Sequence, residues 1–394
     1  MSFNFCRPAR PVTISRQDRE RNVMGPLSGL KVVEFGAIGP GPFCAMLLAD
    51  LGATVIRLDR TQDAGLGVKR DLRFDITKRN RPAIPLDLKT PADRDFALDL
   101  VAGADGLIEG FRPGAMERLG LGPEDCFAVN PALVYGRMTG WGQTGPLSRT
   151  VGHDINYLAL SGALSMIGSK AEGPAIPLNL VSDLGGGALY LAFGMLAAMH
   201  HARETGEGQV VDAAILDGVG SLLTTFRGFR ASGLWVDDYE SNFIDGGAPW
   251  YACYKTRDGK YISVGAVERK FYAEMLDGMG LDASYLDRQM DKESWPEQKR
   301  AFAQIFARKT RDEWDAIFAG REACYAPVLD MDEALAHPQV TERDSVFELD
   351  GIAQTAPAPR FSKSQPETPR PPSAPDPDLA ARMRARGWAA LTTA

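Results

Sequence analysis

The feature that most constrains the fold is a regular alternation of short β-rich runs with amphipathic stretches over residues 31–138. The β-rich runs predict strands at Lys31–Phe35, Thr54–Asp59, Ala83–Leu88, Asp105–Glu109 and Leu133–Met138. The stretches between them predict helices at Phe43–Leu51, Pro91–Ala102 and Glu124–Ala128. Strands that alternate with helices at this spacing are typical of βαβ units. The sequence therefore predicts an α/β fold with an open, mostly parallel sheet.

The pattern changes after Gly152. Helical spacing predicts helices at residues 153–161, 189–199, 212–229, 268–279 and 294–318. Two alternating runs, Tyr251–Thr256 and Lys260–Val264, flank an Asp-Gly pair, which is a hairpin signal. We therefore expect a large α/β domain over residues 25–229 and a smaller α+β domain over residues 230–335.

Two further segments lie outside these domains. Residues 1–24 are polar and form a candidate disordered leader. Within residues 336–394, the stretch Pro357–Pro377 holds eight prolines, which predicts an extended connection. A short helix is predicted near Leu379–Trp388 at the end of the chain.

Charge and cysteine content narrow the classes of function. The 44 Lys and Arg against 51 Asp and Glu give a net charge of −7, which argues against nucleic acid as the main ligand. The five cysteines are widely spaced, so we expect reduced thiols, and no Cys/His cluster has the spacing of a zinc site. The first residues lack a secretory signal, and the longest apolar span, residues 188–199, is shorter than the ~20 residues that a bilayer needs. We expect a cytoplasmic protein without a metal site or membrane span.

The glycine-rich turn between the first strand and the first helix is a candidate cofactor loop. Its glycines at 36, 39 and 41 do not match the G-x-G-x-x-G dinucleotide motif, although Asp59 lies where a ribose-binding acid would lie. Such a turn is more often structural, and we do not predict NAD binding.

The four histidines differ in their surroundings. His200 and His201 end an apolar helix, where a cation is favoured, and His337 precedes a proline, so we interpret these three as structural or solvated. His153 opens a predicted helix after a glycine-rich loop. Asp154 could there act only as a helix cap. Alternatively, backbone N–H groups beside an imidazole suit proton abstraction next to a carbonyl whose oxygen gains charge.

Two acidic residues are candidates for chemistry. Asp183 stands among apolar residues and is followed by three glycines, so burial would raise its pKa; the alternative is a helix cap with close packing at Gly187. Glu268 follows the second strand of the hairpin and by itself is an ordinary first-turn acid. The turn at residues 246–250 is either a binding loop or a tight bend.

Several arginines lie at or after the ends of predicted strands, where ligands of open α/β sheets bind: Arg57, Arg60, Arg112 and Arg118. Because guanidinium groups suit phosphate, these residues suggest a small phosphorylated ligand. The alternative is that each is an ordinary surface charge.

Four sequence segments together resemble the alpha-methylacyl-CoA racemases of the family III CoA-transferase superfamily. The segments are GPGPFCAM (39–46), FRPG (111–114), GHDINYLALSG (152–162) and DGGAPWY (245–251). The resemblance extends from about Gly25 to Arg370. It implies a large Rossmann-like parallel-sheet domain, a smaller α+β domain, and a C-terminal part that returns to the large domain.

The resemblance also implies roles for individual residues. His153 and Asp183 match the catalytic acid–base pair, Glu268 matches the residue that orients the histidine, and Asp154 matches the residue whose backbone N–H meets the thioester oxygen. The implied CoA site comprises Arg60, Leu86, Asp87, Leu88, Lys89, Gly110, Phe111, Arg112, Arg118, Gly152 and Tyr157.

The implied reaction inverts the carbon next to the thioester of a 2-methyl-branched acyl-CoA. One group removes the α-proton, an enolate forms, and the other group returns a proton to the opposite face. No cofactor is needed, because CoA is part of the substrate. The family's subunits interlock as a homodimer, with each active site between the large domain of one subunit and the small domain of the other.

Two alternatives remain at this point. In a family III CoA-transferase, the aspartate at the position of Asp154 attacks the thioester and forms a covalent intermediate. A non-catalytic protein that binds CoA thioesters would keep the arginines but would not need His153 together with Asp183. The adjacent His153, with Asp183 and Glu268, favours proton transfer.

Overall fold

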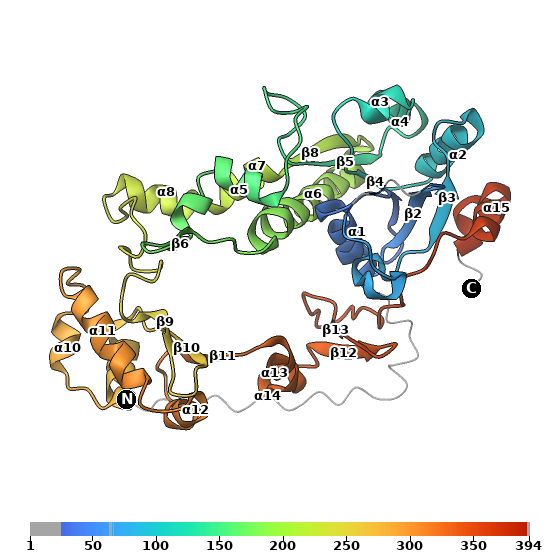
Figure 1. Cartoon of the computed structure of the whole chain (residues 1–394). Coiled ribbons are helices and arrows are strands. Elements are labelled where there is room, and N and C mark those ends of the chain that lie inside the picture. The colour runs from blue at the N-terminus through green and yellow to red at the C-terminus, as the bar shows by residue number, and fades with distance from the viewer. Residues whose placement is uncertain (1–24, 63–64, 66, 392–394) are drawn as a thin grey trace, which may run out of the picture.

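The computed structural model describes residues 25–62, 65 and 67–391, which form a larger and a smaller unit (Figure 1). The prediction for residues 1–24 lies outside this part of the chain. Figure 1 shows the smaller unit joined to the larger one by the segment after α8 and by a C-terminal return through α13, β12 and β13.

The larger unit contains a parallel sheet with the strand order β3-β2-β1-β4-β5-β8. Its strands are β1 (Lys31–Phe35), β2 (Thr54–Arg60), β3 (Ala83–Leu86), β4 (Gly106–Glu109), β5 (Val134–Thr139) and β8 (Gln209–Ala214). β1 pairs with β2 on one side and with β4 on the other, so the strand order reverses between β1 and β4. The predicted α/β class is confirmed, and the reversal is the point where open sheets of this kind bind ligands.

Helices cover both faces of the sheet, because successive strand residues point to opposite sides. Val32 belongs to one core and the adjacent Val33 to the other. The first layer contains α1 (Pro40–Asp50), α5 (Asp154–Leu160), η4 (Leu180–Ala188), α6 (Leu189–Thr205) and α7 (Ile215–Leu222). The second contains α2 (Pro91–Ala102), α3 (Ala115–Arg118), α4 (Pro123–Val129) and α15 (Pro377–Arg386).

The packing of α6 on the sheet uses glycines in two strands. A Cβ atom at Gly106 would lie 2.4 Å from Cε of Met199, and one at Gly136 would lie 2.8 Å from Sδ of Met195. Because both strands lack a side chain there, the methionines enter the core. The helical run Leu180–Thr205 is long and apolar enough to cross a membrane by length and composition alone, and here it is partly buried on the sheet.

The smaller unit has its own aromatic core beneath an antiparallel sheet of order β11-β10-β9. Its elements are β9 (Tyr251–Lys255), β10 (Tyr261–Gly265), α9 (Arg269–Met279), α10 (Ser284–Asp287), α11 (Trp295–Phe306), α12 (Arg311–Phe318) and β11 (Tyr325–Val328). The hairpin predicted from Asp258-Gly259 is present, with Gly259 at φ 80°. Trp250, Phe302 and Trp314 are almost fully buried between the sheet and its helices.

Two predicted helices differ from the structure. In the segment 212–229, Asp212 belongs to β8, and the helix divides at Leu223 into α7 and α8. The segment before α7 becomes an edge strand because β5 offers it a row of backbone partners. The segment 294–318 is two helices, since Thr310 leaves the helical conformation and caps α12 by accepting the N–H of Glu313.

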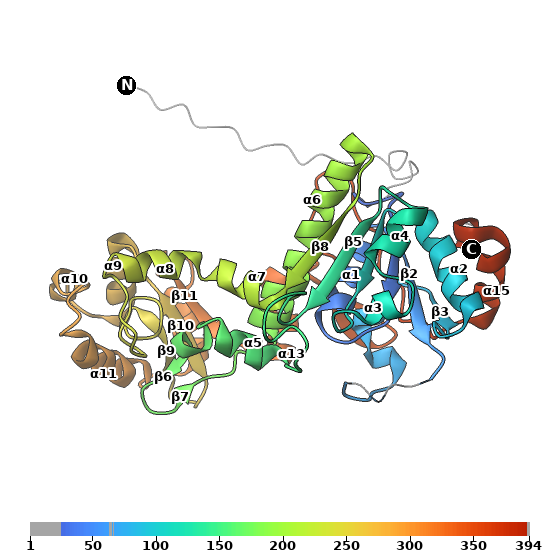
Figure 2. The ribbon, with the colours of Figure 1, turned by 90° about the horizontal axis from the view of Figure 1, so that it is seen from above.

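The chain leaves the larger unit through α8 (Thr224–Ala231), whose position between the units is clear in Figure 2. It returns through α13 (Met331–Ala336), α14 (Pro338–Thr341), β12 (Val346–Leu349) and β13 (Ile352–Thr355), and this last hairpin was not predicted. Residues 357–376 form no helix and pair with the edge strand of the sheet through a bridge between Ala83 and Pro375. The short remaining elements are η1 (Leu72–Phe74), η2 (Ile76–Lys78), η3 (Leu164–Met166), β6 (Gly168–Ser169), β7 (Gly173–Pro174) and η5 (Gly387–Leu391).

A buried ion pair attaches the returning hairpin to the larger unit. Nη2 of Arg79 lies 2.5 Å from Oδ2 of Asp50 at the end of α1, and both side chains are 2% exposed. Nη1 of Arg79 donates to Oε1 of Gln354 in β13 at 3.2 Å. The guanidinium also lies 5.8 Å from the ring of Phe347 in β12. One arginine thus ties α1 to a hairpin almost 300 residues later.

We expect Arg79→Ala to destabilise the protein by about 3–5 kcal/mol, because it leaves the buried Asp50 carboxylate without its charged partner and only the Asn80 amide donates to it. The exposed pair Arg94–Asp95 provides the control, and Arg94→Ala should change stability by less than about 1 kcal/mol. Urea unfolding followed by circular dichroism measures both variants. Equal, small effects of the two substitutions would contradict this account of the hairpin's attachment.

Candidate active site

The loop after β5 places His153 at the start of α5. His153 has extended backbone angles (φ −129°, ψ 171°), and the helix begins at Asp154. The side chain of Asn156 accepts the His153 N–H at 3.0 Å, while the His153 carbonyl accepts the Asn156 N–H at 2.7 Å. This reciprocal capping fixes the point where the helix begins. The His153 side chain is exposed and faces a cavity.

Asp183 lies in η4, a nine-residue π-helix that continues directly into α6. Helical turns of this wide type are rare and are frequent at functional sites. Its glycines allow close packing on α7: a Cβ at Gly186 would lie 2.6 Å from Cγ2 of Val219, and one at Gly187 would lie 3.1 Å from Cγ1 of Ile215. Close packing at Gly187 was one of the two interpretations offered by the sequence. The structure shows it together with a half-buried Asp183 that reaches the cavity.

His153 and Asp183 line the same cavity, which has a volume of about 490 Å³. Its walls come from the carboxyl ends of β1, β4 and β5, next to the reversal of strand order. The residues that line it are Ile38, Gly39, Pro40, Gly110, Phe111, Arg112, Pro113, Met138, Thr139, Gly140, Trp141, Ser148, Thr150, Val151, Gly152, His153, Tyr157, Asp183 and Ile215. A carboxyl group and an imidazole therefore converge on one concave site, as acid–base chemistry requires.

The electrostatic surroundings of Asp183 favour its protonated form. Burial raises the pKa of Asp183 to about 6, and the charge of Asp154 contributes to this rise. A hydrogen bond from Asn179 and the charge of His153 act in the opposite direction. Burial also raises the pKa of Asp154 and of Tyr157. A carboxyl group with a pKa near 6 can exchange a proton readily near neutral pH.

Part of the implied CoA site lies in the same place. Gly110, Phe111, Arg112, Gly152 and Tyr157 all line the cavity. The guanidinium of Arg60 at the end of β2 lies 5.4 Å from the ring of Phe111, which joins it to this group. Leu86, Asp87, Leu88, Lys89 and Arg118 do not line the cavity. The first four end or follow the edge strand β3, and Arg118 ends α3.

Arg57 is structural, contrary to the suggestion from its place near a strand end. It is 1% exposed, and its Nε donates to both carboxylate oxygens of Asp59 at 3.0 Å. Its Nη2 donates to the carbonyl of Ser373 at 3.0 Å. These bonds also occupy Asp59, the residue that lies where a ribose-binding acid would lie.

Glu268 lies apart from the other candidate residues. It is an exposed residue that precedes α9 in the smaller unit, and it does not line the cavity of His153 and Asp183. Within one chain, the structure therefore brings His153, Asp154 and Asp183 together but does not add Glu268.

Two residues of the site were missed from the sequence. Trp141 lines the cavity and meets the ring of Tyr157 edge-on, with centroids 4.7 Å apart. Its position directly after β5 was the available signal. Asn179 hydrogen-bonds Asp183, and no sequence pattern indicated it.

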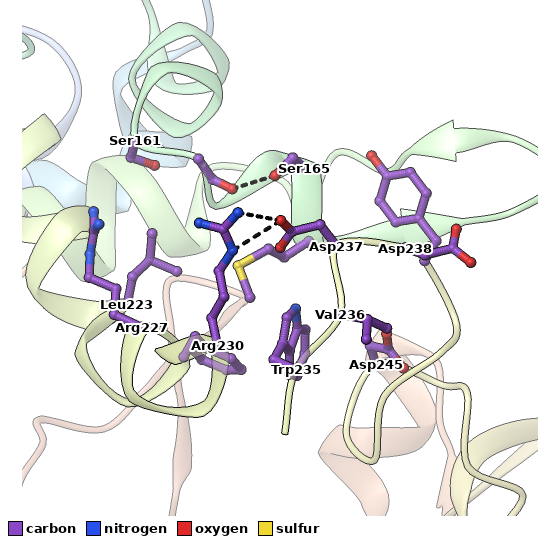
Figure 3. Close-up of a pocket in the computed structure, with 14 residues that line it drawn as sticks. Ser161, Ser165, Leu223, Arg227, Arg230, Trp235, Val236, Asp237, Asp238 and Asp245 are labelled. Carbon is purple, nitrogen blue, oxygen red and sulfur yellow. Dashed lines mark hydrogen bonds and ion pairs between the residues drawn. The ribbon is translucent and has the colours of Figure 1, made fainter. Parts of the chain in front are cut away.

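A second cavity, of about 360 Å³, lies beyond the other end of α5 (Figure 3). Its charged groups are largely satisfied within the protein: Nε of Arg230 donates to Oδ2 of Asp237 at 3.0 Å, as Figure 3 shows. Asp245 accepts the N–H groups of Asn242 and Gly247 at 2.9 and 3.0 Å. These bonds fix the glycine-rich turn as a tight bend, and neither His153 nor Asp183 lines this cavity.

Comparison with known proteins places these features in one family. The family model described as CoA-transferase family III matches residues 27–382. The chain is 44% identical to mouse alpha-methylacyl-CoA racemase over 88% of each chain, and 44% identical to the human protein of the same name over 81% of this chain and 82% of that one. Among solved structures, a CAIB/BAIF family protein from Brucella suis superposes with a TM-score of 0.78 at 24% identity, covering 92% of this chain and 99% of that one.

The raised pKa of Asp183 predicts a pH-dependent gain in stability for Asp183→Asn. The folded-state pKa of about 6 exceeds the ordinary value of 3.8, so stability is lost as the pH rises from about 4 towards 6. Above pH 6 the parent holds a partly buried negative charge that the variant lacks. The variant should be more stable by roughly 1–3 kcal/mol at pH 8 and by much less at pH 4.

Thermal unfolding of the parent and the Asn variant at the two pH values measures this difference. Asp105→Asn serves as the control, because Asp105 is also half-buried but precedes β4 at the opposite end of the sheet. A gain that is equal at pH 4 and pH 8 would show that ionisation of Asp183 is not its cause.

Proposed function

Since the chain belongs to CoA-transferase family III, we propose that it racemises the α-carbon of 2-methyl-branched acyl-CoA thioesters. His153 and Asp183 form the acid–base pair in this proposal. The single observation that carries it is that both side chains line one cavity at the carboxyl ends of the strands. The identity of 44% to two alpha-methylacyl-CoA racemases, each matched over more than four fifths of its length, supports the same reaction.

The chemistry requires two groups with similar proton affinities. A proton next to a thioester is weakly acidic, and its removal leaves an enolate. Inversion then needs one group to remove the proton from one face and a second group to deliver a proton to the other. A neutral His153 and a protonated Asp183 perform one direction, and the reverse direction exchanges their roles. A carboxyl pKa of about 6 brings Asp183 close to the range of an imidazole.

The enolate oxygen needs a hydrogen-bond donor that is already in position. Asp154 is the first residue of α5, so its backbone N–H is not used by the helix itself. We assign this N–H to the thioester oxygen, and one such donor contributes roughly 3–4 kcal/mol to the stabilisation of the transition state. At the other end of the substrate, Arg60, Arg112 and Arg118 supply positive charge for the phosphates of CoA.

The alternative within the same family is CoA transfer with Asp154 as a covalent nucleophile. Asp154 directly follows His153, which lines the cavity, and this position supports the alternative. Against it, Oδ1 of Asp154 accepts the backbone N–H of Asp183 at 2.7 Å, which holds the carboxylate towards η4. The two reactions differ in whether an acceptor acid is required.

We expect a single pure epimer of a 2-methylacyl-CoA, incubated in deuterium oxide, to racemise and take up deuterium at the α-carbon without an added acid. His153→Ala should slow the racemisation by about 10²-fold or more, the usual contribution of a general acid or base. Its affinity for CoA should stay nearly unchanged. Chiral chromatography and mass spectrometry follow the exchange, and His200→Ala, an exposed histidine on α6, is the control.

Three outcomes would decide against this assignment. Strict dependence on an acceptor acid, together with an adduct on Asp154, would establish the transferase. Racemisation at the parental rate by His153→Ala would exclude that residue from the acid–base pair. CoA binding without exchange or transfer would indicate a non-catalytic binding protein.

The position of Glu268 leads to a second part of the proposal. Glu268 is exposed and lies outside the cavity within its own chain. We propose that two copies interlock as a homodimer, and that Glu268 of one copy hydrogen-bonds and orients His153 of the other. Each active site would then combine the larger unit of one chain with the smaller unit of its partner.

Mixed dimers test this arrangement. We expect His153→Ala and Glu268→Ala homodimers to be almost inactive. A dimer with one chain of each kind should regain one intact site and up to about half of the parental racemisation rate, because losing a general base costs 10²–10⁴-fold at the other site. Co-expression with two different affinity tags isolates the mixed dimer. If Glu268 served its own chain, no mixed site would be intact and activity would not return.

A further inference from the structure

Asp154 connects α5 to η4 through two hydrogen bonds. Its Oδ1 accepts the backbone N–H of Asp183 at 2.7 Å, and its carbonyl oxygen accepts the hydroxyl of Ser182 at 3.0 Å. One residue at the start of α5 therefore contacts two consecutive residues of η4, almost 30 positions later in the chain. The second of these is the candidate catalytic carboxylic acid.

The first of these bonds replaces a partner that η4 itself does not provide. The bond from the Leu184 N–H to the Asn179 carbonyl, at 3.1 Å, has the i to i−5 spacing of a π-helix. Asp183 is the residue before Leu184. Its N–H is therefore one of the donors at the start of a helix that have no acceptor within the helix. The Asp154 carboxylate satisfies this donor inside a half-buried site, where an unpaired N–H is costly.

The composition of η4 makes this external support important. Three of its nine residues, at positions 185–187, are glycine, which is among the least favourable residues in a helix. The glycines fit closely against α7, but they do not fix the backbone around Asp183. The bond from Asp154 acts on the peptide N–H of Asp183 itself, and so on the position from which its side chain enters the cavity.

We propose that the carboxylate of Asp154 is a positioning group, which holds η4 so that the Asp183 side chain enters the cavity opposite His153. This inference rests on the proposed proton-transfer function. It assigns a role to the Asp154 side chain, separate from the role proposed for its backbone N–H at the thioester oxygen.

The same contact has an electrostatic consequence. Burial is the largest cause of the raised pKa of Asp183, and the negative charge of Asp154 is the second. On α5, His153 lowers that pKa, and Tyr157 also interacts with the Asp183 charge. Asn179, just before η4, lowers it through a hydrogen bond, and no other ionisable residue in the described part of α1, α6, α7 or β5 contributes. Removal of the Asp154 charge should therefore lower the pKa of Asp183.

Two substitutions separate position from charge. Asp154→Asn keeps an oxygen that can accept the Asp183 N–H but removes the charge, whereas Asp154→Ala removes both. We expect Asp154→Ala to lower kcat for racemisation by about 10²-fold, the effect of a misplacement of roughly 1 Å. We expect Asp154→Asn to stay within about tenfold of the parent, well short of the 10²–10⁴-fold loss of an acid–base group. In Asp154→Asn, the limb of the kcat/KM profile due to Asp183 should move to lower pH.

The control is Asp105→Ala, which removes another half-buried carboxylate that accepts a distant backbone N–H. Oδ2 of Asp105 accepts the N–H of Lys31 at 2.8 Å, at the opposite end of the sheet from the cavity. This variant should lose some stability but keep the parental kcat and pH profile. CoA affinity, measured by calorimetry, should be unchanged in all three variants.

The proposal fails if the pH limb of Asp154→Asn does not move, if Asp154→Ala keeps the parental kcat, or if Asp154→Asn loses as much activity as Asp154→Ala. Should Asp154→Ala not fold, the pH limb of Asp154→Asn decides alone. An absence of exchange in the parent would refute the proposed function. Normal exchange in the parent with normal Asp154 variants would refute only this inference.

Discussion

The close packing of η4 against α7 is the constraint on which the geometry of the site depends. A Cβ atom at Gly218 of α7 would lie 1.8 Å from the carbonyl oxygen of Gly186 in η4, so a larger residue there would separate the two helices. Because the two helices lie this close together, Asp183, three residues before Gly186, reaches the cavity that His153 also lines. Glycine weakens η4 as a helix, and the close approach to α7 offsets that cost through packing. The site therefore depends on backbone-to-backbone contact as much as on its polar side chains.

The buried acidic residues of the sheet and of α1 have different neighbours from those of Asp183. Buried carboxylates of the strands and of α1 have arginine partners, as in Glu34–Arg81, Asp50–Arg79 and Glu109–Arg137. The last pair also fixes the loop proposed to bind CoA, because Oε2 of Glu109 accepts the N–H of Phe111 at 2.6 Å. Asp183 instead has a second carboxylate and an imidazole beside it. In Glu34 and Glu109 the arginine lowers the pKa and so opposes the rise that burial causes, whereas at Asp183 the neighbouring carboxylate adds to that rise.

Local signals in the sequence were sufficient for the elements that are stabilised locally. Pro91 at the first position and Thr90 as the cap set the start of α2, and the helix matches its prediction. β8 was missed, because its strand conformation depends on pairing with β5 and not on its own pattern. The position of Arg57 near a strand end suggested a ligand contact, but burial against Asp59 decided its role. For the site, the sequence indicated which residues to consider. The bond between Asp154 and Asp183 required the packing of α5 on η4 and could not be predicted from spacing.

The two groups of the proposed acid–base pair are held in different ways. Asp183 is positioned within its own unit, by η4 packing and by Asp154. For His153, the backbone is fixed by the capping of α5, while the residue proposed to orient its ring, Glu268, lies on the smaller unit. In the proposed dimer, a single chain would carry a prepared carboxylic acid but an unoriented imidazole. Inversion needs both groups in every turnover, so activity would depend on assembly even though each chain contains every catalytic residue. Asp183 alone could still remove and return the α-proton of one epimer on one face, which exchanges this proton without inversion. The proposed roles therefore imply that an unassembled chain exchanges the proton of that epimer but does not racemise it.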